Sequence, residues 1–135
     1  MRIFPDTNVL ISAFSTRGLC AELYEEILAR HELVCGEVVL IEFRRILSTK
    51  LKVPEARVDE VLRALRRNPV YPRPTETAPY QIRDSDDAWV LATAISSRAD
   101  ILVTGDRDLL AAREEVAEVR IMPPRELWDT LRALS

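Results

Sequence analysis

The chain of 135 residues contains one histidine, two cysteines, three glycines and two lysines, and each scarcity excludes a class of site. Two cysteines and one histidine do not make a disulfide framework or a four-ligand zinc site, and they leave almost no material for Zn hydrolase or Ser-His-Asp chemistry. The three glycines are too few and too scattered for a dinucleotide-binding loop. Any chemistry is therefore expected to use carboxylates.

Long hydrophobic runs are also missing. No run approaches the roughly 20 residues of a membrane span, and residues 1–6 lack the hydrophobic region of a signal peptide, so we expect a cytoplasmic protein with no membrane partner. Apolar residues make up 47% of the chain, charged residues 30%, and the net charge is −3, a balance typical of a folded protein. This length suits one core, which predicts a single domain over residues 1–135.

Short apolar runs alternate with segments of helical periodicity. The expected strands are 3–4, 33–35, 101–103 and 119–122. The expected helices follow residue 6, cover 20–31, begin after residue 36, follow Pro54, cover 87–95, follow residue 106 and close the chain after Pro124. Residues 69–79 contain four prolines and are expected to form a loop. Short apolar strands separated by helices predict the α/β class, with a central parallel sheet flanked by helices on both faces.

Four acids stand where such a fold binds ligands. Asp6 and Asp106 each follow a predicted strand, and ligands of open α/β sheets lie beyond the carboxyl ends of the strands. Glu42 falls at the edge of the inward face of its helix, and Asp87 stands at the first turn of the most apolar helix. Taken separately, these acids can be helix caps or salt-bridge partners.

If the four carboxylates converge, they repel one another, and a hard cation resolves that repulsion. Oxygen ligands without histidine or cysteine favour Mg²⁺ or Mn²⁺. Such an ion can activate water and neutralise charge on a phosphoryl group. The residues therefore indicate metal-assisted hydrolysis of a phosphodiester.

The same residues resemble four ordered motifs of the PIN-domain nucleases, in particular the VapC-type toxins of toxin–antitoxin pairs. The motifs are Asp6-Thr7-Asn8-Val9-Leu10, Glu42-Phe43 with Arg45-Ile46-Leu47, Asp84-Ser85-Asp86-Asp87 before Ala92-Thr93-Ala94, and Val103-Thr104-Gly105-Asp106-Arg107-Asp108. By this resemblance the catalytic and metal-binding carboxylates are Asp6, Glu42, Asp87 and Asp106, with Asn8, Thr104 and Asp108 as supporting groups. Asp87 is chosen over Asp86 because it directly adjoins the apolar helix.

The resemblance also implies a fold, a substrate and partners. It implies a parallel sheet flanked by helices, endonucleolytic cleavage of RNA, an antitoxin that inserts into the acidic crevice, and a homodimer. Two positions depart from the family pattern. Pro5 stands where related chains usually have an aliphatic residue and is expected to shorten the first strand. Gly36 stands where a hydroxyl residue often begins the helix.

Positive charge gathers in one segment. Nine bases and three acids lie between Arg44 and Arg73, which gives this segment +6 in a chain of net charge −3. Such a segment can draw RNA phosphates toward an acidic metal site, and the possible RNA-binding residues are Arg44, Arg45, Lys50 and Lys52. A solvated helix face and an acidic partner protein are the alternatives. Trp89 and Trp128 are expected in or near the core.

The sequence thus predicts an Mg²⁺- or Mn²⁺-dependent endoribonuclease that is the toxin of a toxin–antitoxin pair. The alternative is a weak or inactive PIN-like module that binds RNA or a partner. A phosphatase stays open, because metal–carboxylate sites cleave many phosphate esters. A receiver domain fits less well, because it needs a lysine after a late strand and both lysines here, Lys50 and Lys52, precede the proline-rich loop.

Overall fold

The centre of the molecule is a parallel sheet whose middle strands are apolar on both faces. The computed structural model describes residues 1–134, and its four-stranded sheet has the order β2-β1-β5-β6 with every pairing parallel. The strands are β1 (Arg2–Pro5), β2 (Glu32–Leu33), β5 (Ile101–Val103) and β6 (Arg120–Met122). Ile3, Phe4 and all of β5 are completely buried, because helices cover both faces of the sheet.

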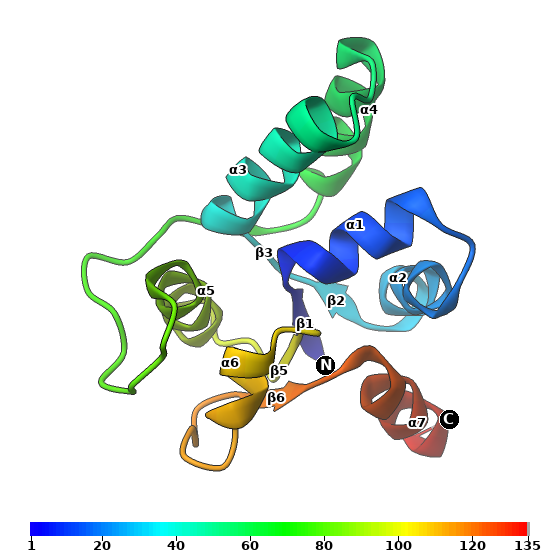
Figure 1. Cartoon of the computed structure of the whole chain (residues 1–135). Coiled ribbons are helices and arrows are strands. Elements are labelled where there is room, and N and C mark those ends of the chain that lie inside the picture. Colours follow the sequence, from blue (N-terminus) through cyan, green and yellow to red (C-terminus); the bar gives the residue numbers. More distant parts are fainter. Residues whose placement is uncertain (135) are drawn as a thin grey trace.

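Within residues 1–134, seven α-helices surround this sheet. They are α1 (Thr7–Ser15), α2 (Leu19–Arg30), α3 (Glu37–Arg45), α4 (Glu55–Leu65), α5 (Ser85–Ser96), α6 (Arg107–Ala111) and α7 (Pro124–Leu134), and a π-helical turn, Ile46–Lys50, extends α3. Helix α5 lies to one side of the sheet, and α2 and α7 lie to the other (Figure 1). The predicted α/β architecture is confirmed. Within residues 1–134, no helix is both long and apolar enough to cross a membrane.

The strand expected at residues 33–35 is in fact two strands in two sheets. β2 ends at Leu33, and β3 (Cys35–Gly36) pairs instead with β4 (Val70–Tyr71) in a second, two-stranded parallel sheet. β4 lies inside the proline-rich segment that was expected to be a loop. The prolines do not prevent this pairing, because the carbonyl of Pro69 accepts the Cys35 N–H at 2.9 Å and needs no donor of its own.

The expectation that Pro5 shortens the first strand is wrong. β1 extends through Pro5, and the next residue, Asp6, donates its N–H to the Val103 carbonyl at 2.9 Å on the β5 side. Ile3 faces the other neighbour, since its carbonyl accepts the Val34 N–H at 2.9 Å. Backbone groups alternate sides along a strand, so Pro5 faces the β2 side, where β2 has already ended at Leu33. Its missing donor therefore costs no ladder hydrogen bond.

Gly36 begins α3 against the ring of Phe4. A Cβ atom at position 36 would lie 2.5 Å from Phe4 Cζ and 3.1 Å from Thr93 Cγ2. Phe4 is completely buried in the sheet and Thr93 is completely buried in α5, so neither side chain has free space to move into. The close approach of β1, α3 and α5 therefore explains why this chain has glycine where a hydroxyl residue often caps the helix.

This contact yields a stability prediction. Gly36→Ser should lower the free energy of unfolding by about 1–3 kcal/mol, because overpacking in a dense core outweighs the gain of an N-cap hydroxyl. Chemical denaturation monitored by circular dichroism measures the change. Gly18→Ser is the matched control: Gly18 precedes α2, and a Cβ there meets only Thr16 Oγ1 at 3.7 Å. Equal effects at both positions would contradict the packing argument.

Candidate metal centre

The buried carboxylate of Asp6 is the first component of the site. Asp6 directly follows β1 and begins α1, and its side chain is only 4% exposed. Its Oδ1 accepts the Thr7 N–H at 2.7 Å, and its Oδ2 accepts the Thr104 hydroxyl at 2.7 Å and a longer contact from Asn8 Nδ2 at 3.4 Å. Asp6 therefore caps a helix and at the same time takes part in a polar network at the carboxyl end of the sheet.

Thr104 connects Asp6 to Asp106. The completely buried Thr104 hydroxyl donates to Asp6 and accepts the Asp106 N–H at 2.9 Å. Asn8 adds a second link, because its Oδ1 accepts the Gly105 N–H at 3.0 Å. The ends of β1 and β5 are thus held together by two side chains that the family resemblance assigned as supporting groups.

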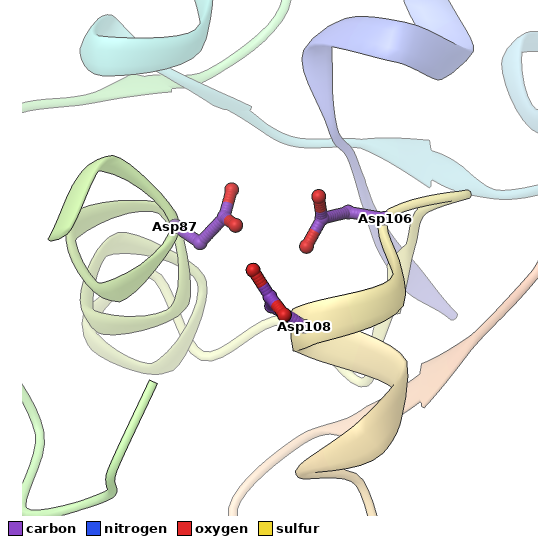
Figure 2. Close-up of side chains that lie close together, drawn as sticks. All are labelled: Asp87, Asp106 and Asp108. Carbon is purple, nitrogen blue, oxygen red and sulfur yellow. The ribbon is translucent and has the colours of Figure 1, made fainter. Parts of the chain in front are cut away.

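Three carboxylates converge beside this network. One oxygen from each of Asp87, Asp106 and Asp108 lies within 4.8 Å of the others, and all three side chains are partly buried. Asp87 comes from the first turn of α5, and Asp106 and Asp108 come from the start of α6 (Figure 2). Asp106 Oδ2 also caps α6 by accepting the Leu109 N–H at 3.0 Å. The sequence left helix capping and convergence of the acids as alternatives. Asp106 does both.

Burial and neighbouring negative charge shift the pKa values of two acids of the site, Asp87 and Asp6. Partial burial, the hydrogen bond with Asp106 and the negative charge of Asp106 raise the pKa of Asp87 to about 8. Burial also raises the pKa of Asp6, against the hydrogen bonds from Thr104 and Thr7, and the charges of Glu42 and Asp106 add to this rise. Without a cation, the cluster therefore holds a proton at a carboxyl group that would ordinarily be ionised at neutral pH.

Glu42 and Asp86 lie on the neighbouring side of the site. Both line a cavity between α3 and α5, and Glu42 is close enough to Asp6 for its charge to influence that carboxyl group. Neither residue belongs to the group of three converging acids. In the part of the chain that is described, Glu42 forms no salt bridge, which was its alternative role.

The residues fit a hard divalent cation. The group consists of carboxylate oxygens alone, and among residues 1–134 no lysine or arginine forms an ion pair with Asp87, Asp106 or Asp108. Oxygen-only sites select Mg²⁺, Mn²⁺ or Ca²⁺ over zinc or copper. Asp108, assigned only a supporting role from the sequence, stands in this group, whereas Asp6 and Glu42 lie outside it.

The basic residues divide into paired and unpaired groups. Arg44 binds Glu55 at 3.0 Å and Asp59 at 2.9 Å, so it fastens α3 to α4. Arg45 lines the cavity beside Glu42. Arg45, Lys50 and Lys52 are exposed and form no salt bridge within the described chain. Of the four possible RNA-binding residues, these three remain available to a polyanion.

Sequence reasoning missed two residues beside the site. Trp89, expected in or near the core, is half-buried and lines the same cavity as Glu42, with the Arg73 guanidinium carbon 4.2 Å from its ring centroid. Trp89 follows Asp86 by three positions, which places both on one face of α5. That spacing could have placed Trp89 beside the site. The sequence carries no comparable signal for Arg73, which approaches from a distant loop.

The family is established by comparison with known proteins. The model of the PIN domain matches residues 2–108, and the chain therefore belongs to the PIN domain family. This confirms the family indicated by the four motifs. No curated protein matches the chain at the level of sequence.

Solved structures share the fold. VapBC2 from Rickettsia felis bound to a promoter DNA fragment has a TM-score of 0.68 and 17% identity, covering 91% of this chain and 98% of that chain. FitAB bound to IR36 DNA has a TM-score of 0.68 and 16% identity, covering 90% and 94%. VapBC from Salmonella typhimurium has a TM-score of 0.64 and 20% identity, covering 92% and 98%. At these identities the likeness establishes a common fold.

The Thr104 hydroxyl should be a large contributor to stability. Thr104→Val keeps the shape but leaves the Asp106 N–H without this acceptor and buried Asp6 without its strongest donor, which should cost about 1–3 kcal/mol in urea denaturation. Thr104→Ser keeps the hydroxyl and loses one methyl group, so its cost should be about 1 kcal/mol. A valine variant as stable as the serine variant would show that the hydroxyl bridge contributes nothing.

The acidic cluster should make metal-free stability depend on pH. Folding raises the pKa of Asp87 from 3.8 to about 8, so the folded state binds a proton more tightly than the unfolded chain between these values. The melting temperature in chelator should therefore fall as pH rises from about 4 to about 8. Asp87→Asn should flatten this slope, raise the melting temperature at pH 8 and weaken Mn²⁺ binding in calorimetry.

The matched control for this experiment is Glu25→Gln, which removes one exposed negative charge from α2, away from the cluster. It should leave both the slope and Mn²⁺ binding unchanged. If Asp87→Asn and Glu25→Gln behave alike, repulsion within the cluster does not control the protonation of the site.

Proposed function

We propose that this chain is a divalent-metal-dependent endoribonuclease. The observation that carries the proposal is the convergence of Asp87, Asp106 and Asp108 within 4.8 Å at the carboxyl end of the sheet, beside buried Asp6. Membership of the PIN domain family supports nuclease activity in general. The oxygen-only donor set favours Mg²⁺ or Mn²⁺ as the cofactor.

The proposed ligands are Asp6, Glu42, Asp87 and Asp106, as the motifs imply, and the geometry adds Asp108. A bound ion would supply activated water and neutralise charge on the phosphate. Asp87 would release its proton when an ion binds, because the positive charge would offset the burial and the negative neighbours that raise its pKa. Thr104 and Asn8 hold the ends of β1 and β5 together. The carboxylates that follow these strands would therefore keep their positions when their charges change.

RNA is the proposed substrate because of the charges around the site. Arg45 lies beside the acids, and Lys50 and Lys52 follow on the π-helical turn and the loop after it. Lys50 and Lys52 can bind the phosphate backbone of a polyanion, with an affinity that falls as salt rises. A small phosphate ester would gain little from so extended a positive surface, which makes a phosphatase the weaker proposal.

We further propose that the protein is the toxin of a toxin–antitoxin pair acting in the cytoplasm. The similar structures from Rickettsia felis and Salmonella typhimurium are VapBC complexes bound to DNA, and their fold supports an antitoxin partner here. The antitoxin would insert into the acidic crevice, and the toxin would form a homodimer. The proposed organisation is a single domain over residues 1–135. The alternative function is a weak or inactive PIN-like module that binds RNA or a partner.

Cleavage of RNA tests the proposal directly. Purified protein should cut members of a set of structured and single-stranded RNAs in Mg²⁺ or Mn²⁺ and leave them intact in chelator. Asp87→Asn should reduce the rate more than about 100-fold, because loss of a ligand costs more than loss of a group behind one. Asp6→Asn should also abolish cleavage while circular dichroism shows an intact fold.

Glu25→Gln is the control, and it should cleave at the wild-type rate. Wild-type rates for both Asp6→Asn and Asp87→Asn would refute the assignment of the site. Binding of RNA without cleavage under any metal would favour the inactive module. Arrest of bacterial growth on expression, relieved by Asp87→Asn, would support the toxin role, and normal growth would count against it.

A further inference from the structure

The cavity beside the acidic site is lined by one aromatic ring, four charged side chains and three aliphatic ones. It has a volume of about 270 Å³ and lies between α3 and α5. Glu42 and Arg45 enter it from α3, Asp86 and Trp89 from α5, and Arg73 from the loop before α5. Glu42 lies near enough to Asp6 for its charge to influence that carboxyl group, and Asp86 precedes Asp87 in α5, so the cavity adjoins the proposed metal site.

Trp89 and Arg73 form a platform in which the arginine lies over the indole ring. The guanidinium carbon of Arg73 lies 4.2 Å from the centroid of the indole ring, which is half-buried and also lines a second hollow beside the loop before α5. Unpaired bases of RNA stack on aromatic rings and on arginine planes. The platform is therefore better suited to stacking on an unstacked RNA base than to packing in the hydrophobic core.

The walls of the cavity carry both donors and acceptors. Asp86 and Glu42 present carboxylate oxygens, which accept hydrogen bonds, and Arg45 presents a guanidinium group, which donates them. Guanine is the base whose pairing edge places two donors, N1–H and N2–H₂, beside an acceptor, O6. A carboxylate on the two donors and a guanidinium on O6 would satisfy that whole edge.

We propose that this cavity binds a guanine base of single-stranded RNA next to the phosphate that is cut. Trp89 and Arg73 would stack on the base, Asp86 would accept from N1–H and N2–H₂, and Arg45 would donate to O6. The inference rests on the proposed ribonuclease function. The cavity volume of about 270 Å³ lies near the lower end of the range for small-molecule pockets, which suits a single base.

Fluorescence of Trp89 tests this site without cleavage. The chain has two tryptophans, Trp89 and Trp128, so Trp128→Phe leaves Trp89 as the sole indole reporter. Titration in chelator with the pentanucleotides UUGUU, UUAUU and UUCUU compares three ligands of equal charge. UUGUU should quench Trp89 and bind roughly tenfold more tightly than the other two, as one well-matched base edge provides.

Two variants in the Trp128→Phe background separate base reading from charge. Arg45→Gln should reduce the ratio of the UUGUU and UUAUU affinities to about one, and Asp86→Asn should reduce it as well. Arg67→Gln removes the same charge from an exposed position after α4, outside the cavity, and should weaken all three ligands alike or not at all. Circular dichroism confirms that each variant is folded.

Equal affinities for the three RNAs, or no change in Trp89 fluorescence, would overturn the guanine site. If the cavity binds a peptide segment instead of a base, the titration should likewise show no preference for UUGUU. Cleavage of RNA without preferential UUGUU binding would leave the nuclease standing and reject this inference. Preferential UUGUU binding with no cleavage under any metal would support the guanine site and count against the nuclease.

Discussion

The acidic site depends on one hydroxyl group, that of Thr104. Its single proton is donated to Asp6 and its lone pairs receive the Asp106 N–H, so it joins two segments that are 98 residues apart in sequence. The group is completely buried, and an unsatisfied polar atom in that position would be costly. The parallel pairing of β1 with β5 brings these segments together, and the hydroxyl bridge then holds the Asp6 carboxylate next to the backbone of Asp106. The register of the β1–β5 pairing therefore also determines the geometry of the site.

Much of this arrangement could be predicted from the sequence, because strong local signals mark it. Ile101–Val103 is apolar on both faces and became the buried strand expected of it, and Asp6 and Asp106 mark helix starts by the capping that their position suggested. The two-residue strands β3 and β4 carry no periodicity and exist only because distant segments meet. Asp108 joins Asp87 for a similar reason: a helix of five residues gives no pattern from which side-chain direction can be read.

Charge is distributed so that most of the basic segment stabilises the fold while a few residues stay available. Arg44, Arg57 and Arg66 pair with acids on the surface, and each such exposed pair contributes less than about 1 kcal/mol. The acids of the site have the opposite character, since their negative charges repel one another and one of them, Asp87, holds a proton more tightly as a result of burial and its neighbours. Binding sites commonly carry such local destabilisation, which the remainder of the fold must offset. The completely buried core that runs from Ile3 through Leu65 to Leu127 offsets it here.

The long separation between Asp6 and Thr104 in sequence also determines when the site can form during synthesis of the chain. Ribosomes add about 5–20 residues each second, so about 5–20 s pass between the appearance of the first acid and that of the hydroxyl that positions it. Through nearly all of that interval β1 has no β5 to pair with, and Asp106 and Asp108 have not yet been added to the chain. The carboxylate site is therefore incomplete until the last third of the chain has been made. An enzyme with the proposed ribonuclease activity would in this way spare the message and the ribosome that are producing it.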